Sequence, residues 1–314
     1  MQDFRRLVGF TLFITYLVIL AGAVVRGTGS GLGCPDWPRC FGQWIPPIDV
    51  SELPANYKEV YTIAGKEIAD FDAFKTWTEY LNRLIGAFLG FLIFIMFFKS
   101  FKHSEQEPNL PWFCGIILFL VLIQGGLGAV VVSSHLKPFI ITLHMMLALL
   151  LMFTLHYLRK YCFDLMNFGL NFVADKKNLF HTKILILLTS LQVVMGTQVR
   201  EQVDSLMRDL KTATADTVVD QLGWMFYVHR SFSVILVVYC VWNLMRLYRF
   251  DETGGAFQRN LLFLVLILVN VASGIGLNYF GFPAQMQPPH LFVAVLAMGV
   301  LFEQYLNQKG SLIS

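Results

Sequence analysis

Three histidines of this 314-residue chain lie one or two helical turns inside the same end of long apolar segments, where ionisable side chains are rare. Two of them, His229 and His290, fall in the second half of the chain. Imidazoles that face each other at one depth in a helical bundle can hold a haem iron at both axial positions. The pair therefore favours a haem site. The alternatives are a zinc site, a quinone pocket, a proton relay and two buried structural histidines.

The third histidine, His144, occupies the matching place in the first half, but the residue at the opposing position is Asn82. An asparagine amide is a poor ligand for haem iron, so the first half predicts a haem with one open axial position. Glu79 precedes Asn82 by about one helical turn. A partly desolvated carboxylate at the membrane edge can shuttle protons or orient water. The alternative is a surface acid that is stabilised by the dipole at a helix N-terminus.

Four arginines border the same apolar ends: Arg26 and Arg83 in the first half, and Arg200 and Arg230 in the second. No phosphate-loop pattern accompanies the glycines that follow Arg26. Guanidinium groups in this position are suited to pair with haem propionates or with lipid headgroups.

Two of the five cysteines, Cys34 and Cys40, lie outside the apolar segments in a proline-rich stretch. Facing an oxidising compartment, thiols at this spacing can close a disulfide. The bond would be either a structural staple or a redox-active pair, because exposed loop disulfides are the reducible ones.

The elements that position these residues are transmembrane helices. The chain is 56% hydrophobic and only 14% charged, which excludes a soluble globular protein. Each bilayer crossing takes about 20 apolar residues as helix. Eight segments qualify, so the predicted fold class is all-α with eight transmembrane helices: 7–25, 81–98, 112–132, 138–158, 180–198, 227–247, 260–278 and 289–306.

Lysine and arginine gather in the loops on one side of these segments, which predicts that this side and both termini are cytoplasmic. The first segment lacks a small-residue cleavage site, so we expect a retained helix in a cell inner (plasma) membrane. The net charge of +3 follows from this bias and gives no reason to invoke nucleic acid.

The chain repeats its own plan. The segment Trp77–Arg83 recurs at Trp224–Arg230, with histidine in place of the asparagine and phenylalanine in place of the glutamate. Segments beginning at His144 and His290 match in the same way. We therefore predict two tandem pseudo-symmetric four-helix bundles. Their expected bounds are 1–158 with an outer loop at 27–80, a cytoplasmic linker at 159–179, and 180–314, with a short surface helix within 201–223.

These motifs together resemble the haem A synthase family over the whole chain. The resemblance is carried by the segment from Gly22 through Cys40, by the Glu79-Tyr80-x-x-Arg83 motif, and by the histidines on alternate helices. One position departs from the family motif, which has histidine where this chain has Asn82.

The resemblance implies two successive oxidations of the haem O methyl group to a formyl, giving haem A for terminal oxidases. It implies a haem B held by His229 and His290, substrate haem near His144, and Glu79 as the catalytic acid. Cys34 and Cys40 match the family's outer-loop cysteine pair. Expected partners are haem O synthase, an electron acceptor such as a quinone or an outer-side thiol protein, the assembling terminal oxidase, and the lipid bilayer.

A different class of function also fits the residues. The chain could be a haem B electron carrier between quinol and an outer-side partner, with Asn82 marking a half that has lost its catalytic haem. A third possibility is a structural assembly partner of an oxidase that needs no haem.

Overall fold

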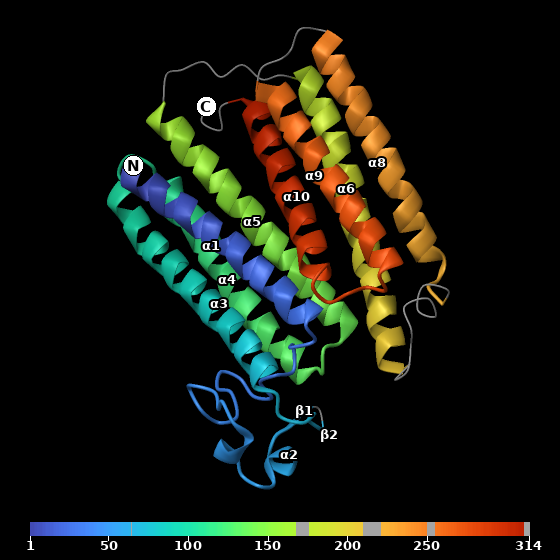
Figure 1. Ribbon diagram of the computed structural model, residues 1–314. Coiled ribbons are helices and arrows are strands. Elements are labelled where there is room, and N and C mark those ends of the chain that lie inside the picture. Colours follow the sequence, from blue (N-terminus) through green and yellow to red (C-terminus); the bar gives the residue numbers. More distant parts are fainter. Residues whose placement is uncertain (64, 168–175, 210–220, 250–254, 311–314) are drawn as a thin grey trace. The chain divides into compact units, whose positions relative to one another are not determined.

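Long helices make up most of the molecule (Figure 1). The computed structural model describes residues 1–63, 65–167, 176–209, 221–249 and 255–310. Within these ranges all eight predicted apolar segments are helical, and each helix is long and apolar enough to cross a membrane. The eight are α1 (Gln2–Gly27), α3 (Ala73–Ser100), α4 (Asn109–Ser133), α5 (Pro138–Met166), α6 (Lys176–Asp209), α8 (Trp224–Arg249), α9 (Gly255–Tyr279) and α10 (Gln287–Lys309).

The helices extend beyond their apolar segments, and this corrects three expected boundaries. The outer loop is shorter than 27–80, because α3 already begins at Ala73, where Asp72 accepts a hydrogen bond from the Lys75 amide and caps the helix. The linker predicted at 159–179 is helical up to Met166 and again from Lys176. Residues 201–209 continue α6 instead of starting a surface helix, and 210–220 lie outside the described residues.

The chain divides into two compact units, Met1–Cys162 and Phe163–Ser314. In the first unit α3 packs against both α1 and α4. The Tyr16 hydroxyl and His156 Nε2, 2.9 Å apart, join α1 to α5. His156 thus has a partner within its own bundle.

In the second unit α6, α8, α9 and α10 form a closed ring in which each helix contacts two others. The core of this ring takes buried side chains from every helix: Leu185, Leu236, Cys240, Phe263, Ile267, Ala297 and Leu301. Two four-helix units therefore correspond to the two copies of the sequence repeat.

The outer loop between α1 and α3 folds over its own small core (Figure 1). Its elements are η1 (Val50–Glu52), α2 (Tyr57–Val60) and a hairpin of β1 (Thr62–Ile63) with β2 (Lys66–Glu67). The core consists of Cys34, Cys40, Phe41, Leu53 and Tyr57. This loop lies at the end of the first unit where the predicted catalytic residues are found. A further one-turn segment, η2 (Phe101–His103), follows α3 at its other end.

Candidate functional site

Glu79 is the only carboxylate among the predicted site residues, and the structure buries it. It lies in the second turn of α3 and is 3% exposed. Its Oε2 accepts a hydrogen bond of 3.0 Å from the Cys34 amide, and its Oε1 accepts from Arg83 Nη2 at 2.5 Å and Nε at 3.2 Å. A buried carboxylate needs such partners to offset its lost hydration. Glu79 is therefore a fixed group that connects α3 to the outer loop.

Arg83 completes this connection. Beyond the ion pair with Glu79, its guanidinium donates to the carbonyl oxygens of Asp36 at 2.6 Å, Arg39 at 3.0 Å and Cys34 at 3.1 Å. All three guanidinium nitrogens thus have partners within the protein. The planar donor fork of arginine suits this arrangement, because one group can satisfy several fixed acceptors. In this structure Arg83 organises the loop around Glu79.

The loop approaches α3 at Gly33 so closely that a side chain there would not fit. A Cβ on Gly33 would lie 2.5 Å from the Lys75 carbonyl oxygen. The Gly33 carbonyl accepts a hydrogen bond of 2.9 Å from Thr76 Oγ1. Glycine at this position lets the adjacent Cys34 amide reach the Glu79 carboxylate.

Cys34 and Cys40 form the predicted disulfide. Both residues are fully buried in the loop core. The reason is the packing of Phe41 and Tyr57 over the cysteines. Because Cys34 is also bonded through its amide and carbonyl to Glu79 and Arg83, the disulfide loop and the buried acid form one cluster.

The repeat places a different pair at the matching position of the second unit. Phe226 stands where Glu79 stands in the first, and Arg230 lies over the Phe226 ring at 5.8 Å and over the Tyr227 ring at 5.4 Å. A buried ion pair in one unit is thus a cation–π contact in the other. Only the first unit has an acid at this position.

His144 lies on α5 against a polar residue of α4. The amide nitrogen of Gln124 lies 3.2 Å from His144 Nε2 and 3.1 Å from the His144 carbonyl oxygen. Gly128, one turn further along α4, leaves room for the ring, because a Cβ there would be 3.5 Å from His144 Cε1. The His144 Nδ1 is buried without a partner.

Asn82 takes the corresponding position on α3 and faces Gly22 of α1, whose Cβ would lie 3.9 Å from Asn82 Oδ1. This oxygen is buried and has no hydrogen-bond partner. The spacing between the glycine and its neighbour is wider here than around the histidines, because asparagine is smaller than histidine. No contact between Asn82 and His144 is resolved among the described residues.

In the second unit His229 and His290 repeat the arrangement. A Cβ on Gly196 of α6 would lie 3.1 Å from His229 Cε1, and one on Gly274 of α9 would lie 3.2 Å from His290 Cε1. Gln192 Nε2 donates to the His229 carbonyl at 3.0 Å. His229 on α8 and His290 on α10 thus lie in the same four-helix unit.

This setting fits a haem held by two histidines. Each ring packs against a glycine, and a side chain in place of that glycine would displace the ring. His229 Nδ1 is a buried polar atom without a protein partner. Imidazole nitrogens on facing helices are the usual axial ligands of haem iron in a bundle. The two imidazole donors and the space that the glycines leave for them thus both fit a haem.

The two remaining predicted arginines lie near helix ends. Arg26 is half-buried in the last turn of α1. Arg200 of α6 pairs with Asp204 at 2.5 Å and donates to Gln287 Oε1 of α10. Arg200 therefore ties α6 to the helix that carries His290.

Three residues of the histidine sites escaped prediction as site residues: Gln124, Gln192 and Ser273. The sequence repeat could have indicated the two glutamines. A residue with an amide side chain precedes a glycine by four positions at Gln124, at Gln192 and at Asn270. Residues four apart share one face of a helix, so the amide and the glycine meet the same histidine. Ser273, which contacts His290, has no such repeat signal.

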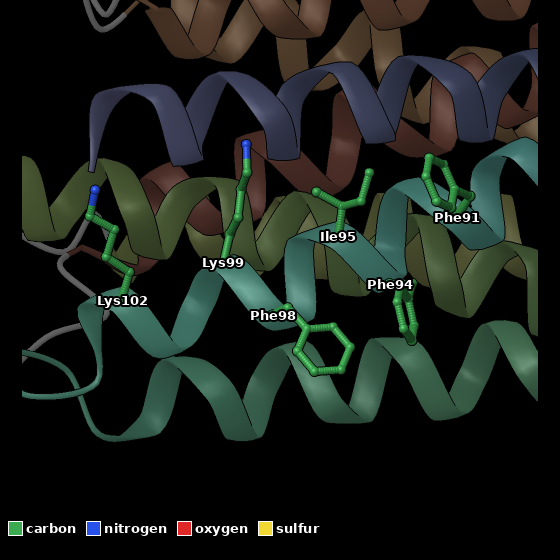
Figure 2. Close-up of a pocket in the computed structure, with 6 residues that line it drawn as sticks. All are labelled: Phe91, Phe94, Ile95, Phe98, Lys99 and Lys102. Atoms are coloured by element: carbon green, nitrogen blue, oxygen red, sulfur yellow. The ribbon is translucent and has the colours of Figure 1, made fainter.

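An open groove of about 490 Å³ lies elsewhere on α3 (Figure 2). Lys99 and Lys102 extend from the helix toward the same side (Figure 2). The other lining residues are apolar: Phe91, Phe94, Ile95 and Phe98. At about 1.5 Å per residue, the nearest of them is roughly 18 Å along the helix from Glu79. The groove is therefore separate from the candidate site.

The chain is similar to known proteins over most of its length. The family described as cytochrome oxidase assembly protein (COX15-CtaA) matches residues 5–302. A heme A synthase of Shewanella oneidensis is 35% identical over 155 residues, covering 49% of this chain and 44% of that protein. One of Shouchella clausii is 30% identical over 46% of this chain and 40% of that protein. One of Mesorhizobium japonicum is 24% identical over 96% of this chain and 89% of that protein.

The first two alignments thus span less than half of the relatives' own lengths, whereas the family match and the third alignment span nearly the whole chain. The family match covers both four-helix units, the disulfide loop, Glu79 and all three histidines. The chain therefore belongs to the COX15-CtaA family of cytochrome oxidase assembly proteins, the haem A synthase family that its motifs resemble.

Proposed function

We propose that this protein is a haem A synthase that oxidises the peripheral methyl group of haem O to a formyl in two successive steps. The observation that carries the proposal is the broken symmetry of the two units. At the repeated ligand positions the second unit has two histidines, His229 and His290, and it has no acid at the position of Glu79. At the same positions the first unit has His144 and Asn82, together with the buried Glu79 cluster. A resident cofactor suits the former site, and a substrate that must react and leave suits the latter.

His229 and His290 are proposed to hold haem B at its two axial positions, with Arg200 and Arg230 near its propionates. When bound, this haem supplies one-electron transfer. The protein's own contribution is to fix the two rings against Gly196 and Gly274 and to exclude water from the bundle.

In the first unit His144 is proposed to bind the iron of haem O from one side, while Asn82 leaves the other side open. Arg26 and Arg83 border this substrate site. Because the Arg83 nitrogens are already bonded to Glu79 and the loop carbonyls, Arg83 acts here mainly by positioning the acid.

Glu79 is proposed as the catalytic acid. Oε1 accepts two hydrogen bonds from Arg83, whereas Oε2 accepts one from the Cys34 amide and keeps a lone pair that can take a proton or hold a water molecule. Fixed donors keep the carboxylate in place, so that it need not reorganise when the methyl group reacts. Asn82 lies one turn away along α3, next to the proposed open iron position.

We also propose the surroundings in which this reaction takes place. The protein spans the cell inner (plasma) membrane with both termini cytoplasmic. It receives haem O from haem O synthase and delivers haem A to the assembling terminal oxidase. A quinone or an outer-side thiol protein accepts the electrons.

Co-expression with a haem O source, followed by pigment extraction and chromatography, tests this function. We expect the unaltered protein to produce haem A and the hydroxylated intermediate. Glu79→Gln should abolish both products and leave haem B bound, because the substitution keeps the shape but removes the acid. Glu59→Gln, which alters an exposed carboxylate of the outer loop, is the matched control and should not affect product formation.

Membranes that contain folded protein but yield no haem A and no intermediate would overturn the assignment. A protein that holds only haem B and is insensitive to Glu79→Gln would instead be an electron carrier.

A further inference from the structure

The ring of His290 is held by a serine that has no counterpart at the other histidines. Ser273 Oγ lies 2.8 Å from His290 Nδ1 and 2.8 Å from the carbonyl oxygen of Asn270, to which it donates. A hydroxyl has one proton, and a carbonyl oxygen can only accept. With its proton directed to Asn270, Ser273 is the acceptor and His290 Nδ1 is the donor.

This bond decides which nitrogen of His290 is free. A neutral imidazole that donates from Nδ1 carries its lone pair on Nε2. With Nδ1 as the donor to Ser273, His290 is in the tautomer that presents Nε2 to an iron.

The repeat shows that this device is local. Ser273 immediately precedes Gly274, and the residues that precede the matching glycines are Leu127 on α4 and Met195 on α6. Neither can accept the bond that Ser273 accepts. In agreement, His144 Nδ1 and His229 Nδ1 are both buried without a hydrogen-bond partner.

We propose that Ser273 is a positioning residue that makes His290 a permanent haem ligand, and that Leu127 at the same place in the first unit leaves His144 Nδ1 without such a bond, so that the haem of the first unit can exchange. The proposal rests on the proposed function, since it assigns the resident haem to the second unit and the substrate haem to the first. It explains how one repeated bundle provides two sites with different residence times.

Two measurable properties follow from the bond. An acceptor on Nδ1–H orients the ring and increases the basicity of Nε2, and loss of such a partner typically lowers metal affinity by about 10–100-fold. A more basic ligand also favours ferric over ferrous iron. Removing Ser273 should therefore loosen the haem and shift its midpoint potential in the positive direction.

The test uses full-length protein purified with its haem. In Ser273→Ala we expect haem transfer to apomyoglobin to become about tenfold faster, with a positive shift of the haem B midpoint potential and altered low-spin EPR g values. Ser273→Thr keeps the hydroxyl and should restore all three. Ser190→Ala is the control, because the Ser190 hydroxyl is satisfied by the Ile186 carbonyl of its own helix, in the same unit.

The converse variant is Leu127→Ser, which places a hydroxyl on α4 at the repeat position of Ser273. We expect it to slow the release of haem from the first unit and to leave the haem B potential unchanged. A readout of haem release keeps this arm independent of catalytic turnover.

The outcomes separate this proposal from the one on which it rests. If the protein holds haem B and Ser273→Ala changes neither the potential nor the transfer rate, the positioning role is wrong and the proposed function stands. If Ser273→Thr behaves like Ser273→Ala, the effect is one of packing and the hydrogen bond is not its cause. A protein that contains no haem B overturns both proposals.

Discussion

Arg83 is the side chain through which α3 holds the outer loop. It bonds to Glu79 and to three loop carbonyls, whereas its repeat partner Arg230 only lies over two aromatic rings. The arginine at the end of the repeated motif is thus present in both halves, but it contacts different groups in each. The cause is the residue four positions earlier, an acid in one half and Phe226 in the other.

This difference predicts unequal costs for the same substitution. Arg83→Gln leaves a buried carboxylate without its counter-ion and should destabilise the loop and its attachment by about 3–5 kcal/mol. Arg230→Gln removes a cation–π contact at an exposed residue and should cost about 0.5–1 kcal/mol. Limited proteolysis of the outer loop and thermal unfolding in detergent would measure both. Equal effects of the two substitutions would contradict the role assigned to Arg83.

At the level of whole helices, glycines on alternate helices decide how closely the ligand-bearing helices approach. Each of α1, α4, α6 and α9 turns a glycine toward the side chain at the ligand position of a neighbouring helix. A glycine weakens a helix by roughly 1 kcal/mol relative to alanine, so its presence at these places indicates a need for space. The space is occupied by Asn82 or by an imidazole ring.

We expect substitution of these glycines by alanine to reduce haem binding most where the added Cβ has the least space. The added Cβ would lie 3.1 Å from the ring at Gly196 and 3.2 Å at Gly274, but 3.9 Å from Asn82 at Gly22. Gly196→Ala and Gly274→Ala should displace the histidines and reduce haem B content severalfold. Gly22→Ala should be tolerated. Haem per protein, measured by pyridine haemochrome, tests this order.

The matched control on the same kind of helix is Gly125→Ala, because nothing lies within 4 Å of a Cβ at that position. Loss of haem in the control comparable to that in Gly196→Ala would mean that helix dynamics, and not the close approach, sets the effect.

The molecule as a whole consists of two units with one plan, and a single position carries most of the proposed asymmetry in ligation. Asn82 stands where the second unit has His229, and both face a glycine of the preceding long helix. The first unit also has Glu79 where the second has Phe226.

Asn82→His should therefore make the first unit resemble the second. We expect haem content in the purified variant to approach two per chain, with a second low-spin haem in its reduced-minus-oxidised spectrum. Product formation should fall at the same time, because the open iron position is closed. An unchanged spectrum would show that Asn82 does not lie at the iron, and unchanged activity with two tightly bound haems would show that an open position is not required.

The number and order of the membrane helices followed from the sequence because hydrocarbon tolerates only backbone that satisfies its own hydrogen bonds, which makes each apolar segment a helix. Helix ends were less well determined. The polar first turns of α3 continue the helix because Asp72 caps it and the loop packs against it, and neither contact is visible in an apolar count.

By itself the sequence determined the eight helices and the repeat. It also indicated the three histidines and Glu79 as candidate site residues and Cys34 and Cys40 as a candidate disulfide pair. It did so because residue type and spacing along a helix fix which chemistry can occur at which depth. Only the tertiary structure decided the partners: that Cys34 and Arg83 hold Glu79, that the disulfide is buried, and that Ser273 lies within hydrogen-bond distance of His290 Nδ1. These contacts join residues from separate segments or depend on side-chain geometry, and only packing specifies them.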